Sequence, residues 1–161
     1  MVLAFRIGFD YETATKSLCG AAILFETIPL AERLSSMPVS LVVDDDPSVR
    51  RYVNTILQRE DFRTLEAEGG THALQIVEEL GGDVDLIVSD IQMPNGDGLT
   101  LAHAVKNSFP AVPVILVSGY SRPDAGFEFV KKPFLPATLI SAVRKFFPHQ
   151  ASKLRVSSDP A

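Results

Sequence analysis

From Val39 onward the chain alternates short apolar runs with amphipathic segments, and this alternation limits the possible folds more than any other feature. Short runs rich in Val and Ile are typical of buried strands, whereas apolar residues at helical spacing indicate helices. Strands are expected at residues 39–43, 62–67, 86–89, 112–117 and 127–130. Helices are expected at residues 47–58, 71–80, 99–108 and 135–147. Asp46 before Pro47 is typical of a helix start with an aspartate N-cap.

Strands that alternate with helices in this way predict a parallel sheet with helices on both faces. Right-handed crossover connections leave few topologies for such a sheet. We therefore expect an α/β fold, a flavodoxin-like doubly wound sheet of five parallel strands in the order 2-1-3-4-5.

The alternating pattern predicts one domain at residues 37–148. Residues 1–36 carry no motif and do not continue the pattern, so we expect either a small N-terminal extension of uncertain structure or an over-extended gene start. Residues 149–161 are polar and are expected to form a flexible tail.

Composition narrows the classes of function. The hydrophobic content of 46% favours a globular protein, and the net charge of -5 argues against direct binding to nucleic acid. The single cysteine, Cys19, excludes an internal disulfide and fits a reducing compartment. The apolar run at residues 18–25 is too short to span a membrane. We therefore expect a cytoplasmic protein that does not contact the membrane.

Acidic residues follow two of the expected strands. Asp44 and Asp45 come directly after the first strand, and Asp90 comes directly after the third. In the order 2-1-3-4-5 these strands are neighbours, and their carboxyl ends meet where such sheets bind ligands. Carboxylates this close repel one another unless a cation such as Mg²⁺, which prefers oxygen ligands, lies between them. For Asp90 alone, a simple cap of the following turn remains an alternative.

Two further strand ends carry polar groups. Ser118 follows the fourth strand, and Lys132 follows the fifth. A metal, a hydroxyl and an ammonium group around one pocket suit an anion such as a phosphoryl group. An aspartate in such a pocket can act as a nucleophile and form an aspartyl phosphate, while the metal and the lysine offset the charge.

Five motifs occur in order along the chain. They are residues 42–50 (VVDDDPSVR), 87–94 (IVSDIQMP), 97–99 (DGL), 117–120 (VSGY) and 130–134 (VKKPF). Together they resemble the receiver domain of two-component response regulators, and the resemblance covers residues 38–147. The combination is far more specific than any one of the motifs.

The resemblance implies a role for each acid. Asp90 is the expected phosphoacceptor. Asp45 and Asp90 are expected to hold Mg²⁺ directly, Asp44 through a water molecule, and Gln92 through its backbone carbonyl.

The resemblance also implies a switch. Ser118 is expected to bind a phosphoryl oxygen and report its presence, and Phe129 is the aromatic residue expected to change rotamer with it. Lys132 is expected to contact the phosphate. The peptide bond between Lys132 and Pro133 is expected to be cis.

The expected function is that of a single-domain response regulator, which is not an enzyme. A sensor histidine kinase or a histidine phosphotransfer protein would donate the phosphoryl group to Asp90, and an unknown output protein would read the result. A pseudo-receiver that binds partners without phosphorylation is one alternative, although the complete set of site residues argues against it. A Mg²⁺-dependent aspartyl phosphohydrolase is less favoured, because Gln92 stands where such enzymes typically have a second acid.

The segment between Ser118 and Lys132 departs from the family pattern. Receivers usually place a full helix here, but Pro123 and Gly126 leave room for about one turn of about 3.6 residues. We expect this fourth helix of the family to be missing or reduced to a turn. The shortened form resembles receivers that occur singly or fused to hybrid histidine kinases.

Overall fold

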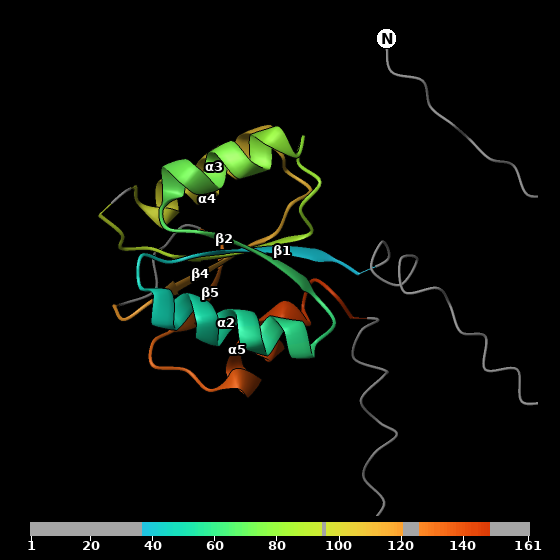
Figure 1. Cartoon of the computed structure of the whole chain (residues 1–161), viewed down its shortest axis with the longest axis vertical. Helices are drawn as coiled ribbons and strands as arrows, with labels where there is room; N and C mark the ends of the chain where they lie inside the picture. The colour runs from blue at the N-terminus through green and yellow to red at the C-terminus, as the bar shows by residue number, and fades with distance from the viewer. Residues whose placement is uncertain (1–36, 95, 121–125, 149–161) are drawn as a thin grey trace, which may run out of the picture.

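The structure is a computed structural model that describes residues 37–94, 96–120 and 126–148 (Figure 1). Its single sheet contains five parallel strands in the order β2-β1-β3-β4-β5. The strands are β1 (Val39–Val43), β2 (Arg63–Ala67), β3 (Leu86–Asp90), β4 (Val114–Ser118) and β5 (Glu128–Lys131). The predicted doubly wound fold and its strand order are confirmed.

Helices cover both faces of this sheet. They are α2 (Pro47–Arg59), α3 (Gly70–Glu79), α4 (Gly98–Ser108) and α5 (Pro136–Val143). Figure 1 shows α3 and α4 on one side of the sheet and α2 and α5 on the other. The predicted cap of α2 is confirmed, since the Asp46 carboxylate accepts a 2.8 Å hydrogen bond from the amide of Ser48.

The core consists of two apolar clusters, one on each face of the sheet. Successive side chains of a strand point to opposite faces. In β1, Leu41 and Val43 therefore belong to the cluster under α3 and α4, whereas Val42 packs with α2 and α5. Because both faces are covered, the inner strands can be apolar at almost every position, which is the pattern that the sequence shows.

Two predicted boundaries differ from the observed ones by two residues or more, and the others by at most one. Strand β4 begins at Val114 rather than at residue 112, because Pro113 has no amide hydrogen to join the ladder. Helix α5 ends at Val143 rather than at residue 147. Beyond it the amides of Lys145 and Phe146 bond to carbonyls three residues back, which tightens the chain into turns.

Several predictions fall outside the described residues. These are the extension at residues 1–36, the tail at residues 149–161 and the centre of the shortened segment, residues 121–125. In the part of the chain that the structure describes, none of the helices has the length and apolar character needed to cross a bilayer.

The register of the strands places the predicted site residues at one end of the sheet. Val43 pairs with Ser89, so the residues that follow them, Asp44 and Asp90, are also neighbours. On the other side of β3, Asp90 pairs with Val117, the residue before Ser118. The carboxyl ends of β1, β3 and β4 therefore converge on a single site.

Candidate functional site

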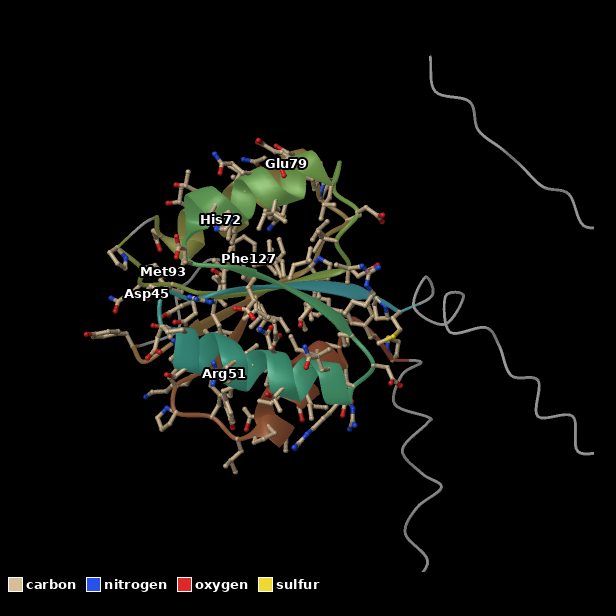
Figure 2. The ribbon with its side chains drawn as sticks, viewed as in Figure 1. Asp45, Arg51, His72, Glu79, Met93 and Phe127 are labelled. Carbon is tan, nitrogen blue, oxygen red and sulfur yellow. The ribbon has the colours of Figure 1, made fainter. Side chains whose placement is uncertain are left out.

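Three carboxylates form the centre of the site. Each of Asp44, Asp45 and Asp90 offers one oxygen, and these oxygens lie within 4.8 Å of one another. Asp44 is buried, Asp90 is partly buried and Asp45 is exposed, so the group opens to solvent on one side. Figure 2 shows Asp45 and Met93, from the loops after β1 and β3, at the same end of the sheet. The predicted convergence of the acids is confirmed.

Lys132 lies between two of these acids. Its Nζ donates hydrogen bonds to Asp44 Oδ2 at 2.7 Å and to Asp90 Oδ2 at 2.9 Å. Its backbone amide donates to the carbonyl of Ser118 at 2.8 Å, which fixes the lysine against the end of β4. The peptide bond to Pro133 is cis, as expected. The ammonium group is therefore held within reach of any anion bound at Asp90.

Burial and pairing shift the pKa values of this pair. Burial raises the pKa of Asp44 above its ordinary value of 3.8, and the hydrogen bond from Lys132 only partly opposes that rise. Burial acts to lower the pKa of Lys132, but its hydrogen bonds to Asp44 and Asp90 outweigh burial, and the net shift is upward. Lys132 is therefore a cation at neutral pH, beside a carboxylate whose charge is disfavoured by its surroundings.

Ser118 provides a buried hydroxyl next to the acids. The residue is only 2% exposed, and its Oγ accepts a 3.2 Å hydrogen bond from the amide of Tyr120. Tyr120 itself is 68% exposed. The hydroxyl is thus positioned by the chain that follows it, while Tyr120 remains exposed.

The other two predicted site residues lie nearby. The amide of Gln92 donates to Asp90 Oδ1 across 3.4 Å, a long contact at an exposed position. Phe129 is partly buried, pairs with Leu116 of β4 and packs against the core cluster under α3 and α4. The roles of the Gln92 carbonyl and the Phe129 ring stay predictions.

Gly98 also contributes to the site, although the sequence indicates it only as a member of the motif at residues 97–99. It begins α4, where the carboxylate of Asp97 caps the helix by accepting from the amide of Leu99 at 3.1 Å. A Cβ at position 98 would lie 1.9 Å from the carbonyl oxygen of Asp90. The sequence does contain a signal for this role. A side chain is normally tolerated directly after a helix cap, so a glycine at that position indicates that something lies close to the backbone.

A polar group beside the first strand was also missed. Arg50 and Asn54 on α2 meet Glu66 on β2, and Arg50 reaches the backbone of the acidic loop. Only the helical spacing of Arg50 and Asn54, four residues apart, places these two on one side of α2. Nothing in the sequence indicates which strand residue they meet.

The donor set fits a hard divalent cation. Mg²⁺ is bound in proteins by one or two carboxylates and keeps open positions for water or phosphate oxygens. Asp45 supplies an exposed carboxylate oxygen, Asp90 a partly buried one and Asp44 a buried one. The residues present therefore suit Mg²⁺.

Comparison with known proteins connects this geometry to a family. The sequence-family model of the response regulator receiver domain matches residues 40–144 of this chain. The sensor kinase CckA of Brucella abortus (strain 2308) is 38% identical over 128 residues, which cover 74% of this chain and 14% of that protein. The DNA-binding transcriptional regulator NtrC of Proteus hauseri is 34% identical over 102 residues, covering 58% of this chain and 21% of that protein. The chain thus spans only a small part of these relatives.

Solved structures match over nearly their whole length. The receiver domain from the hybrid histidine kinase CckA is 35% identical with a TM-score of 0.60, covering 67% of this chain and 97% of that one. The response regulator TrrA of Thermotoga maritima, in complex with Mg(2+)-BeF, is 34% identical with a TM-score of 0.62, covering 68% of this chain and 99% of that one. The chain belongs to the response regulator receiver domain family.

Proposed function

We propose that this receiver accepts a phosphoryl group on Asp90 from the phosphohistidine of a sensor histidine kinase or a histidine phosphotransfer protein. We further propose that it acts as a single-domain response regulator, which passes the signal on by contact with an output protein. Receiver domains serve phosphorylation-based two-component signalling, and this chain belongs to that family. One observation carries the proposal: Lys132 Nζ lies 2.9 Å from the carboxylate of Asp90, inside a group of three acids.

The reacting groups of the proposed transfer are the Asp90 carboxylate and the phosphohistidine of the donor. An oxygen of the Asp90 carboxylate attacks phosphorus, and the bond between phosphorus and the donor's ring nitrogen breaks. The electron pair of that bond returns to the ring, which leaves as neutral imidazole when its other nitrogen carries a proton. The product is an aspartyl phosphate, beside which Lys132 can pair with a phosphoryl oxygen.

Mg²⁺ is the proposed cofactor. Asp45 and Asp90 would hold it directly, Asp44 through water, and the Gln92 carbonyl would complete the set. When bound, the ion would neutralise charge on the phosphoryl oxygens. The similar response regulator TrrA, solved with Mg(2+)-BeF, supports this choice of metal.

The proposed signal begins at Ser118. The aspartyl phosphate carries a charge of about -2 at neutral pH in place of the single negative charge of the carboxylate, and its phosphoryl group offers three acceptor oxygens. The buried Ser118 hydroxyl would turn from accepting the Tyr120 amide to donating to one of these oxygens, and Phe129 would follow. The rearranged surface near β4 and β5 would then be read by the output protein.

The partners and the location are proposed on the same basis. A donor kinase or phosphotransfer protein is supported by the similarity to the receiver of the hybrid histidine kinase CckA. The cytoplasmic location expected from the sequence stays a prediction, as does the expectation that the protein is not an enzyme.

Intact-mass analysis tests the proposal. The wild-type chain is incubated with Mg²⁺ and acetyl phosphate, beside Asp90→Asn and the control Asp83→Asn, an exposed acid outside the site. We expect one phosphoryl adduct on the wild type and the control, and none on Asp90→Asn or after chelation of Mg²⁺. An unmodified wild type would favour a pseudo-receiver. Turnover of many equivalents of donor without a lasting adduct would favour a phosphohydrolase.

A further inference from the structure

The polar group formed by Arg50, Asn54 and Glu66 lies directly behind the acidic loop. We infer that Arg50, oriented by Glu66 and Asn54, is a positioning residue that holds Asp44 and Asp45 in place for the divalent cation. This inference rests on the metal site of the proposed function and adds to it residues that do not themselves contact the metal.

Arg50 binds the backbone of both acids at once. Its Nη1 donates to the carbonyl oxygen of Asp44 at 2.6 Å and to that of Asp45 at 3.3 Å. The Arg50 side chain is only 16% exposed, so these bonds are largely shielded from water. Hydrogen bonds from a charged donor are short and strong, and they fix the orientation of the two peptide groups.

The remaining atoms of Asp44 are fixed as well. Its amide donates to the carbonyl of Ala67 on β2 at 3.2 Å, and its carboxylate accepts from the amide of Asp46 at 2.9 Å. Arg50 therefore binds the carbonyl group of Asp44, whose amide and carboxylate already have partners. For Asp45, the 3.3 Å contact with Arg50 ties an otherwise exposed residue to the fold.

Glu66 and Asn54 hold the guanidinium group in turn. The Nε of Arg50 lies 3.2 Å from Glu66 Oε2, and the Nδ2 of Asn54 lies 2.5 Å from Glu66 Oε1. Each carboxylate oxygen of Glu66 thus has one partner, which fixes its plane. The contacts therefore run from Asn54 on α2 through Glu66 on β2 to Arg50. Arg50 in turn binds the loop that carries Asp44 and Asp45.

A contribution to stability alone does not explain these contacts among Asn54, Glu66 and Arg50. Glu66 is about half exposed, with 53% of its side chain accessible, and exposed ion pairs contribute little to folding. Asn54 is the only polar residue among the buried positions of α2, and its Oδ1 has no hydrogen-bond partner among the residues that the structure describes. A buried acceptor without a partner costs free energy that an apolar residue would avoid. The arrangement instead resembles the outer partners that orient metal ligands in other sites.

Charge and positioning predict opposite effects for Arg50. As a cation near the site, Arg50 repels Mg²⁺, so its removal would strengthen metal binding if charge alone mattered. As a positioning residue, its loss frees the Asp44 and Asp45 peptides and weakens metal binding. Replacement of outer partners typically weakens metal affinity by about 10-fold to 100-fold.

The test is a Mg²⁺ titration of the full chain without phosphodonor, followed by backbone amide NMR shifts. Arg50→Lys keeps the charge but loses the forked donor, and we expect it to bind Mg²⁺ about 10-fold more weakly. Glu66→Gln keeps the acceptor for Asn54 but loses the charge that orients Arg50, and we expect a smaller weakening. Arg51→Lys is the matched control, because Arg51 is the next residue of α2, is exposed and is labelled on that helix in Figure 2.

The inference is overturned if Arg50→Lys and Glu66→Gln bind Mg²⁺ as the wild type and Arg51→Lys do, or if the wild type binds no Mg²⁺. Unfolding measured without metal shows whether Arg50→Lys is folded; if it is not, the Glu66→Gln result decides. The titration is independent of phosphorylation. A wild type that takes no phosphoryl group would end the proposed function, while weaker Mg²⁺ binding by Arg50→Lys would still support its positioning role.

Discussion

Gly98 controls how closely α4 approaches the proposed phosphoacceptor. An added Cβ would lie 1.9 Å from the carbonyl oxygen of Asp90 and 2.7 Å from the hydroxyl of Ser89, so the backbone of β3 or of α4 would have to move. We predict that Gly98→Ala lowers the free energy of unfolding by about 1–3 kcal/mol, as overpacking does elsewhere, and slows phosphorylation.

Urea denaturation with the control Gly119→Ala checks this prediction. Gly119 lies beside Ser118, but nothing lies within 4 Å of a Cβ placed there. The control should stay within about 0.5 kcal/mol of the wild type. Equal stability of Gly98→Ala and Gly119→Ala would show that the close approach is not a constraint.

Asp44 makes stability depend on pH. Its pKa in the folded protein is raised above 3.8 by burial, so the folded state holds this proton more firmly than the unfolded state. The stability that it contributes is therefore complete below pH 3.8 and is lost as the pH rises through the raised pKa. Asn at this position imitates the protonated carboxyl group and removes that loss.

We predict that Asp44→Asn gains stability relative to the wild type as the pH rises from about 4 to about 7 in metal-free buffer. Urea denaturation at several pH values gives the difference between the two free energies of unfolding. A difference that stays constant or shifts in favour of the wild type over this range would contradict the assigned direction of the Asp44 pKa.

The residues that carry the chemistry of the site were easier to predict than the contacts that hold these residues in place. Asp44, Asp45, Asp90, Ser118 and Lys132 could be named because each follows a strand and falls in a motif. The supporting contacts could not be found in this way. They depend on which side chains of α2 and β2 face each other, and the sequence does not specify that.

At the scale of elements, α5 depends on one apolar side. Leu139 is fully buried against the sheet, whereas Leu135, at the N-cap of the same helix, is 72% exposed. We predict that Leu139→Ala lowers the free energy of unfolding by about 2–5 kcal/mol. Leu135→Ala should change it by no more than about 0.5 kcal/mol.

Thermal or urea unfolding of the two variants makes this comparison. Both changes remove the same side-chain atoms, one inside α5 and one at its N-cap, so the difference between them reports mainly burial. Similar losses for both would mean that Leu135 also packs against the domain and is not exposed at the start of α5.

The element boundaries show where local patterns lose their predictive value. The start of β4 could have been corrected from sequence, because Pro113 cannot donate to a ladder. The end of α5 could not. Phe146 and Phe147 continue the apolar spacing of the helix, yet the chain turns there. The Phe147 ring packs edge-on against the ring of Phe62, with 5.2 Å between the two ring centroids. Such a contact between distant residues depends on the tertiary fold.

At the scale of the whole molecule, topology assembles the site. The sheet order places β1 and β3 side by side, and Ser118 at the end of β4 and Lys132 after β5 complete the same site. This arrangement was predictable because strand and helix alternation leaves few topologies. The site is thus a consequence of the fold, whereas the precision of its loops depends on single contacts such as those of Gly98 and Arg50.

The most direct measurement is to locate the phosphoryl group after reaction with acetyl phosphate and Mg²⁺. Borohydride reduction marks the modified aspartate, and trypsin then separates the candidates, because Arg50 and Arg63 lie between Asp44–Asp45 and Asp90. We predict the mark on Asp90, in the peptide of residues 64–106, with Asp44 and Asp45 unmodified. A mark on Asp44 or Asp45 instead would contradict the assignment of Asp90 as the phosphoacceptor.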